Sequence, residues 1–388
     1  MHISSFFLAL SLLFIVLSAL GLFAPRIILR FCPLRNQSQQ AEKFSGTVSV
    51  IIPLHEHFGS IEQKVRDLAA QLNPVHDELL LVLDGPVSPE AEQFPDRVMQ
   101  ECGIPVLESF GVPVKVIALP RQGKNAALNA AAEQASGTVL IITDRDAKPG
   151  LRVLDKLLAP FSDPKVGAAC GFLQIEGKSV AAQQIYWSGE ARIKMEESQR
   201  LGNLTAANGS LLAIRKSLFP HFPDGVADDM YAILHIRKKG FLSVFIPEAL
   251  VFSPPRQHLP RAVMQRQRRV VGQGLRSLFF HLLLMNPLRH GAFALVLVCH
   301  KVLRRLTPFF LCASLFLACQ ALPGWWASGC LCFFMALFFL SLWLVFFRFR
   351  EVEIRHGLAA RFVWLLAVGL GICIGVIDAA MGKASKTW

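Results

Sequence analysis

The stretch Thr138-Val139-Leu140-Ile141-Ile142-Thr143-Asp144-Arg145-Asp146-Ala147 decides how the rest of the chain is organised. Its first half is a run of β-branched and aliphatic residues between Gly137 and the turn Lys148-Pro149-Gly150, which predicts a short buried strand. Its second half places two carboxylates one residue apart where that strand ends. Mg²⁺ and Mn²⁺ accept carboxylate oxygens in such loops, with water and phosphate as further ligands. The alternative is an acidic loop without a function.

The composition indicates a membrane protein rather than a single soluble globule. Of the 388 residues, 53% are hydrophobic, and the mean hydropathy is +0.43. The net charge of +12 comes largely from basic residues beside apolar stretches, so anionic lipid explains it better than nucleic acid, which we do not expect as a partner. The nine Cys form no Cys-x-x-Cys pair, which argues against a zinc site and a disulfide framework.

Apolar segments at both ends of the chain predict membrane spans. Residues 1–25 predict a retained N-terminal anchor, because the basic residues follow the apolar run instead of preceding it. Residues 26–46 predict a cytoplasmic linker. Residues 256–305 predict amphipathic interfacial helices, and residues 306–388 predict a short tail after three spans, at 306–322, 326–347 and 361–380.

Between residues 47 and 255 the apolar pattern alternates between strand and helix. This alternation predicts an α/β domain with a mostly parallel, doubly wound sheet. The predicted strands are 48–53, 78–83, 114–119, 138–142, 166–174 and 241–246, and the predicted helices are 60–72, 88–102, 124–135, 151–159, 180–200 and 230–239. A small-residue turn at 206–210 leads into the apolar stretch 211–215. Ligands bind such sheets at the carboxyl ends of the strands, where Asp84, Asp144 and Asp146 are expected.

Six short motifs follow one another along the chain. They are Val50-Ile51-Ile52-Pro53, Leu83-Asp84-Gly85, Gly123-Lys124-Asn125-Ala126-Ala127-Leu128-Asn129, Asp144-Arg145-Asp146, Asp228-Asp229 and Gln265-Arg266-Gln267-Arg268-Arg269. With these motifs in this order, the chain resembles membrane-integrated family 2 glycosyltransferases from about residue 47 to 310. That group includes polysaccharide synthases and ceramide glucosyltransferases. The chain departs from the usual pattern at Arg145, where a small residue is common, and at Arg269, which replaces a Trp.

The resemblance implies a Rossmann-like GT-A domain at residues 47–255 and a role for each motif. Asp144 and Asp146 would hold Mg²⁺ or Mn²⁺, and Asp229 would be the general base. Donor binding is implied for Pro53, Glu56, Asp84, Lys124, Asp144, Gln265, Arg268 and Arg269, and the acceptor side for Asn208, Gly209 and Asp228. Simpler interpretations remain for several of them: Lys124 at a solvated helix start, Asn208 and Gly209 in an ordinary turn, Asp228 and Asp229 stabilising a helix start, and the arginines at lipid headgroups.

We therefore expect an inverting, metal-dependent glycosyltransferase that uses a nucleotide-sugar, most simply a UDP-sugar. The acceptor would be a membrane lipid or a growing glycan. We expect an integral protein of a bacterial inner membrane, with the catalytic domain in the cytoplasm. One alternative is a processive polysaccharide synthase that also exports its product. Another is a non-catalytic membrane protein that uses the GT-A domain to bind nucleotide or a partner.

Overall fold

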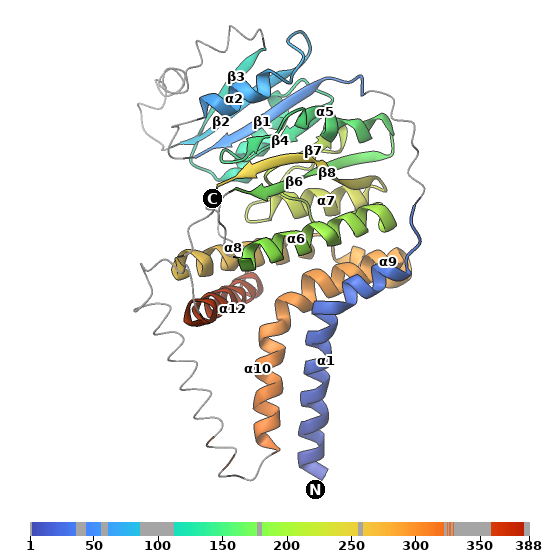
Figure 1. Ribbon diagram of the computed structural model, residues 1–388, viewed down its shortest axis with the longest axis vertical. Coiled ribbons are helices and arrows are strands. Elements are labelled where there is room, and N and C mark those ends of the chain that lie inside the picture. The colour runs from blue at the N-terminus through green and yellow to red at the C-terminus, as the bar shows by residue number, and fades with distance from the viewer. Residues whose placement is uncertain are drawn as a thin grey trace. The chain divides into compact units, whose positions relative to one another are not determined.

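The computed structural model describes residues 2–35, 44–55, 61–85, 112–176, 181–254, 259–321 and 358–383, together with Gly324, Trp326 and Gly329. The chain divides into two compact units, each treated separately below. The sheet unit comprises Pro33–Pro255, and the helical unit comprises Met1–Cys32 with Arg256–Ser385. Figure 1 labels their helices and strands.

The sheet unit is built on an eight-stranded mixed sheet with the order β3-β2-β1-β4-β7-β6-β8-β5. Strands β3, β2, β1 and β4 are mutually parallel, and β6 is parallel to β8, while β7 and the short β5 run antiparallel to their neighbours. The strands are β1 Val48–Leu54, β2 Glu78–Gly85, β3 Val114–Pro120, β4 Val139–Ile142, β5 Lys148–Pro149, β6 Val166–Ile175, β7 Leu212–Arg215 and β8 Leu242–Ser253. The mostly parallel sheet confirms the predicted fold class.

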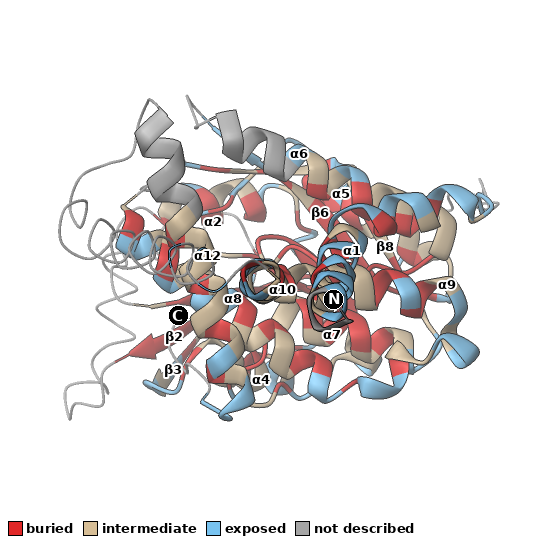
Figure 2. Cartoon of the chain, turned by 90° about the horizontal axis from the view of Figure 1, so that it is seen from below, coloured by how far each residue is buried: buried red, intermediate tan, exposed pale blue. Residues whose placement is uncertain are grey.

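Helices cover both faces of this sheet, because its central strands are apolar on both sides. In β1, Ile52 packs into a core cluster with residues of α2 and α5, whereas its neighbour Ile51 packs into a second cluster with residues of α4 and α7. Figure 1 shows α2 and α5 on the side of the sheet opposite α6 and α7, and Figure 2 shows strands such as β2 and β6 as largely buried. The helices are α2 Glu62–Ala69, α4 Lys124–Gln134, α5 Val153–Leu158, α6 Ala181–Glu196 and α7 Asp228–Lys238.

Two elements of the sheet unit differ from the prediction. Strand β8 continues to Ser253, past the Ile246 end that Pro247 suggested, because its pairing with β6 shifts register between Gly171 and Phe172 and then resumes. A single π-helical turn, η4 Glu197–Leu201, follows α6. The predicted helix at 88–102 lies outside the described residues.

The helical unit contains two close helix pairs. The first joins α1 His2–Phe31 to α10 Arg304–Gln320, which lie side by side in Figure 1. The Ser11 hydroxyl lies 2.9 Å from the Ser314 carbonyl oxygen and 3.0 Å from the Ser314 hydroxyl. Gly21 of α1 allows the same close approach at Arg304, since a Cβ at Gly21 would lie 2.7 Å from the Arg304 amide nitrogen. Small residues and hydroxyl bonds of this kind join helices in membranes.

The second pair joins α8 Pro260–Phe279 to α12 Leu358–Ala380. Gly371 and Gly375 of α12 lie four residues apart against the backbone of α8. A Cβ at Gly371 would lie 2.4 Å from the Met264 carbonyl oxygen, and one at Gly375 would lie 2.5 Å from the Arg268 carbonyl oxygen. The two helices therefore contact each other through their main chains.

Two helical stretches are long and apolar enough to cross a membrane, at Ser5–Phe31 and Pro287–Gln320, and a shorter apolar helix covers Leu366–Ala380. Helix α1 extends through Pro25 to Phe31, so it includes residues that we predicted as linker. Helix α9 Pro287–Leu297 continues through the π-helical η7 Val298–Leu303 into α10, so the basic residues near 300 do not interrupt the helical path. The predicted span at 326–347 falls outside the described residues, apart from Trp326 and Gly329.

Candidate active site

Three neighbouring parallel strands bring their carboxyl ends to one edge of the sheet. The order β2-β1-β4 places the end of β2, which contains Asp84, one strand away from β1 and two from β4. Asp144 follows β4 after a single residue, Thr143. The predicted convergence of polar residues at this edge therefore depends on main-chain pairing, which is set by the buried aliphatic runs of the three strands.

A buried lysine of α2 holds the loop that contains Asp144 and Asp146. Lys64 Nζ donates to Thr143 Oγ1 at 2.9 Å and to the Ala147 carbonyl oxygen at 2.8 Å, and it also bonds the Asp144 carbonyl oxygen. Only 4% of Lys64 is exposed. Burial lowers its pKa to about 7, although the nearby charges of Asp144 and Asp146 act to raise it. The three bonds fix the main chain of the loop, so that its two carboxylates are held in a defined conformation.

A second lysine, at the start of α4, lies between two of the predicted carboxylates. Lys124 Nζ donates to Asp144 Oδ1 at 2.9 Å and lies at an ion-pair distance of 3.0 Å from Asp228 Oδ2. Burial acts to lower the pKa of Lys124, but Asp144 and Asp228 together raise it above its ordinary value. The lysine is therefore charged, and it joins the loop after β4 to the first turn of α7.

Gly209 forms one side of this charged cluster. A Cβ at Gly209 would lie 3.5 Å from Lys124 Nζ, 3.9 Å from Asp228 Oδ2 and 4.0 Å from Asp144 Oδ2. The glycine thus leaves space directly beside the charged atoms. The next residue, Ser210, forms two hydrogen bonds with the loop that follows β4. Its hydroxyl donates to Asp144 Oδ2 at 3.3 Å, and its carbonyl oxygen accepts from Thr143 Oγ1 at 2.9 Å. The predicted acceptor-side turn and the Asp144 loop are therefore parts of one site.

Asp84 and the asparagines of the Gly123–Asn129 motif have clear structural partners. Asp84 is buried, and its two carboxylate oxygens accept from the main-chain N–H groups of Gln122 at 2.6 Å and Gly123 at 2.9 Å, just before α4. Gly123 has a φ of 96°, which favours glycine at that turn. Asn129 exchanges two hydrogen bonds with the main chain of Phe222, at 2.8 and 2.9 Å. These contacts position Lys124 and the segment that leads into α7.

Asp229 is a carboxylate whose pKa is raised. Burial raises the pKa of Asp229 to about 6, and the neighbouring charge of Asp228 acts in the same direction. The positive charges of Lys194 and Lys124 and a hydrogen bond from the Met230 N–H, at 2.7 Å, act against that rise. A carboxylate with a pKa near 6 is ionised at neutral pH and is a stronger base than an ordinary aspartate, which suits proton abstraction.

The two carboxylates predicted to hold a metal ion fit a hard divalent cation that also binds phosphate. Asp146 is exposed, and its Oδ2 accepts from Ser253 Oγ at the end of β8 at 3.4 Å, while Asp144 is half-buried. Among the described residues, no group of three or more His, Cys, Asp or Glu side chains is arranged to hold a metal. Mg²⁺ and Mn²⁺ accept such a small protein ligand set, because water and substrate phosphate complete the shell.

The remaining predicted residues are dispersed. Pro53 is buried in β1 opposite Val82 of β2, and Glu56 lies outside the described residues. Gln265, Arg268 and Arg269 lie on α8 of the helical unit. There, the Arg268 guanidinium bonds both carboxylate oxygens of Asp378 on α12. Their predicted roles in donor binding therefore stay predictions, and Arg268 has a second function in joining two helices.

Sequence reasoning missed Lys64, Thr143, Ser210 and Lys194. Lys64 could have been found, because it lies on the same helical stripe as Ile61, Val65 and Leu68, where a charged residue needs a buried partner. Lys194 gave a similar signal, since a lysine between Ala191 and Met195 falls on the side of α6 that packs against the core. The hydroxyl residues gave no signal, because Thr and Ser at strand ends are common.

Comparison with known proteins supports the fold and the class. A family model described as Glycosyl transferase family 2 matches residues 49–222, which include Asp84, Lys124 and Asp144. No curated protein sequence matches the chain. Among solved structures, the mannosyltransferase PcManGT from Pyrobaculum calidifontis, in complex with GDP-Man and Mn²⁺, is similar with a TM-score of 0.65 and 18% identity. That similarity covers 97% of this chain and 99% of the other.

Two further solved structures match the chain with lower TM-scores. GalNAc-T7, in complex with UDP, GalNAc and Mn²⁺, has a TM-score of 0.40 and 18% identity, covering 54% of this chain and 43% of that one. Glucosyl-3-phosphoglycerate synthase from Mycobacterium tuberculosis has a TM-score of 0.38 and 14% identity, covering 59% of this chain and 80% of that one. The family match over residues 49–222, together with the mostly parallel mixed sheet, supports a family 2 glycosyltransferase with a GT-A fold in the sheet unit.

Proposed function

We propose that this glycosyltransferase moves a sugar from a nucleotide-sugar to a hydroxyl group of a membrane lipid or growing glycan at a membrane surface, with inversion at the anomeric carbon. The observation that carries the proposal is a charged cluster in which Lys124 Nζ lies 2.9 Å from Asp144 and 3.0 Å from Asp228, and in which Gly209 leaves space beside all three side chains. The next residue after Asp228 is Asp229, whose pKa is raised. The two apolar helical stretches support attachment to a membrane.

Each residue of the cluster has a proposed part in the reaction. Asp144 and Asp146 would hold Mg²⁺ or Mn²⁺, which would act as a Lewis acid on the donor diphosphate. Lys124 adds a positive charge beside Asp144, where the diphosphate of the donor would develop negative charge. Gly209 leaves room for a substrate beside these groups.

Asp229 is proposed as the general base. The acceptor oxygen attacks the anomeric carbon, the bond from that carbon to the diphosphate oxygen breaks, and the acceptor proton passes to the Asp229 carboxylate. One displacement with one base inverts the configuration, so an α-linked donor gives a β-linked product. The raised pKa of Asp229 makes it a better proton acceptor than an ordinary aspartate.

One assay can identify both the sugar donor and the acceptor. Purified protein in lipid nanodiscs is incubated with radiolabelled UDP- and GDP-sugars, Mn²⁺ and a lipid extract, and the products are separated by thin-layer chromatography. GDP-mannose belongs in the panel because PcManGT, with the same fold, binds it. Product length separates a single transfer from processive synthesis.

Two variants test the residue roles. Asp229→Asn is expected to lower kcat by about 10²–10⁴-fold, as for loss of a general base. Asp146→Asn is expected to abolish the response to added Mn²⁺. Asp155→Asn, which changes an exposed carboxylate on α5, is the matched control and retains full activity. Turnover at wild-type rates in both active-site variants would refute the proposed function.

A further inference from the structure

We infer that Lys194 is a positioning residue for this reaction: its buried ammonium group holds the Asn208–Ser210 turn in place and sets the charge environment of Asp229. The inference rests on the base role proposed above for Asp229. It concerns a residue on α6 that none of the six motifs includes.

Lys194 is bonded to two neighbouring residues of one short turn. Lys194 is 6% exposed, and its Nζ donates to the Ala207 carbonyl oxygen at 3.1 Å and to the Asn208 side-chain oxygen. A lysine removed from water to this degree loses hydration free energy that must be replaced by hydrogen bonds and nearby negative charge. Its two bonds go to the same short turn, so the lysine is bound to the acceptor side of the site.

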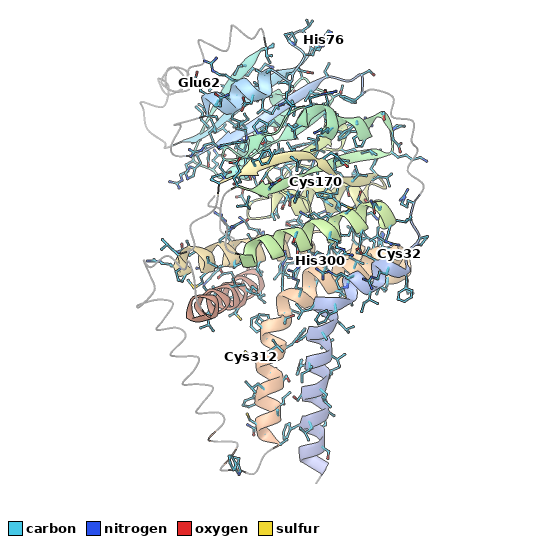
Figure 3. The ribbon with its side chains drawn as sticks, in the orientation of Figure 1. Cys32, Glu62, His76, Cys170, His300 and Cys312 are labelled. Carbon is cyan, nitrogen blue, oxygen red and sulfur yellow. The ribbon has the colours of Figure 1, made fainter. Side chains whose placement is uncertain are left out.

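Asn208 is held by three hydrogen bonds. Its side-chain amide donates to the Gly171 carbonyl oxygen at 3.2 Å, and its main-chain N–H donates to Cys170 Sγ at 3.0 Å. Cys170 and Gly171 lie in β6, and Figure 3 shows Cys170 in the sheet above α6. The third contact is Lys194. Because Asn208 is 9% exposed and held this firmly, the lysine determines where the following Gly209 and Ser210 lie.

A series of contacts links Lys194 to the loop that contains Asp144 and Asp146. Gly209 faces Lys124, Asp144 and Asp228, and the Ser210 hydroxyl donates to Asp144 Oδ2 at 3.3 Å. One turn beyond Lys194, Glu197 accepts from the Thr205 N–H at 2.9 Å and from the Thr205 hydroxyl at 2.7 Å. Helix α6 and its π-helical continuation therefore hold Thr205, Ala207 and Asn208, the residues that lead into Gly209 and Ser210.

The charge of Lys194 also acts on Asp229. The charged or titratable groups that act on Asp229 are Asp228 on α7 itself, Lys124 on α4 and Lys194 on α6, and Asp229 in turn acts on Cys170 of β6. Burial and Asp228 raise the pKa of Asp229, and Lys194 is the first of the cations that oppose the rise. Without Lys194, the base would hold its proton to a higher pH, and less of it would be ionised at neutral pH.

Three substitutions separate the charge of Lys194 from its hydrogen bonds. Lys194→Gln keeps a donor for the turn but removes the charge, Lys194→Arg keeps the charge, and Lys194→Met removes both. Lys156→Met, on the exposed side of α5, is the matched control. All four proteins are checked for folding by circular dichroism and gel filtration before kcat is measured from pH 5 to pH 9.

We expect the acidic limb of the kcat profile to move up by about one pH unit or more in Lys194→Gln and Lys194→Met, because a neighbouring opposite charge is worth a shift of that size. Lys194→Arg and Lys156→Met keep the wild-type limb. The KM for the acceptor should rise in Lys194→Met but not in Lys194→Gln. A purely structural lysine would lower kcat equally at every pH. A limb that stays in place in Lys194→Gln overturns the inference.

A measurement without turnover separates this inference from the proposed function. Infrared titration follows the protonated carboxyl band, which Asp229→Asn assigns to Asp229. Removal of the Lys194 charge is expected to raise that titration midpoint whether or not a donor has been found. If the midpoint moves and no sugar is transferred from any donor, the proposed function fails and the inference about Lys194 stands. If sugar is transferred and the midpoint does not move, only the inference fails.

Discussion

Buried charges are held differently in the two units. In the sheet unit, the buried Lys64 and Lys194 donate to carbonyl oxygens near Asp144 and Asn208, and the half-buried Lys124 pairs with Asp144 and Asp228. In the helical unit, α8 is rich in arginine, and the buried carboxylate of Asp378 on α12 binds Arg268. In the first case oxygen atoms hold a buried cation, and in the second an arginine holds a buried carboxylate.

In both units the buried group fixes geometry. Lys64 and Lys194 bond the main chain of a loop and of a turn, whereas the carboxylates Asp144, Asp146 and Asp229 are exposed or half-buried. Asp378 likewise joins α12 to α8 through Arg268. Helical periodicity places Gln265, Arg266 and Arg269 on a different side of α8 from Met264 and Arg268, which contact α12.

The largest expected effect comes from removing the lysine between two carboxylates. Lys124→Met leaves Asp144 and Asp228 close together without their shared cation, and breaking a largely buried pair in this way costs about 3–5 kcal/mol. We expect a lower Tm and a loss of activity of at least about 100-fold at one Mn²⁺ concentration, measured by thermal unfolding and by the transfer assay. Lys124→Arg should recover part of the stability. A variant as stable as wild type would show that Lys124 does not join the two segments.

The second prediction concerns pH. Asp229 must be ionised to accept a proton, and its pKa is raised to about 6, so kcat should be level above about pH 7 and fall about tenfold per unit below pH 6. The rate at saturating donor and acceptor, measured across that range, checks this. A profile that stays flat to pH 4.5 would remove Asp229 from the role of base.

The smallest effect is expected for the pair in the helical unit, because half of the Arg268 side chain is exposed. Asp378→Arg should destabilise the protein by about 1–2 kcal/mol through like-charge repulsion with Arg268. The double variant Arg268→Asp with Asp378→Arg should recover at least half of that loss in thermal unfolding. The exposed pair of Arg152 and Asp155 gives the control, since Asp155→Asn should change stability by less than about 0.5 kcal/mol. A double variant no better than the sum of its single changes would argue against the pair.

The sequence alone predicted the central strands of the sheet. The aliphatic runs of β1, β2 and β4 are long enough to be recognised, and they can only be buried together. The sequence was also sufficient for the Asp144 loop, since a carboxylate pair after a buried strand is a local pattern. It did not predict that Asp84 would accept from the Gln122 and Gly123 N–H groups, because that contact joins segments 38 and 39 residues apart.

The partners of buried lysines and of Asp378 could not be predicted for the same reason. Lys64 contacts residues 79 to 83 positions away, and Arg268 contacts a residue 110 positions away. Composition and periodicity indicate that such a group needs a partner, but only the packing of the elements determines which one. The continuous path from α9 to α10 was missed because the cluster of basic residues near 300 predicted an interruption, whereas α1 and α10 place Gly21 and Arg304 in contact there.

The hydrogen bond between Ser11 and Ser314 has a consequence for how the protein is made. The two residues are 303 positions apart, so Ser11 leaves the ribosome long before its partner exists. At about 5–20 residues per second, the interval is about 15–60 s. During that time the Ser11 hydroxyl must bond to other groups, such as the main chain of its own helix. The first helix is therefore synthesised early, and its contact with α10 forms only after Ser314 has been made.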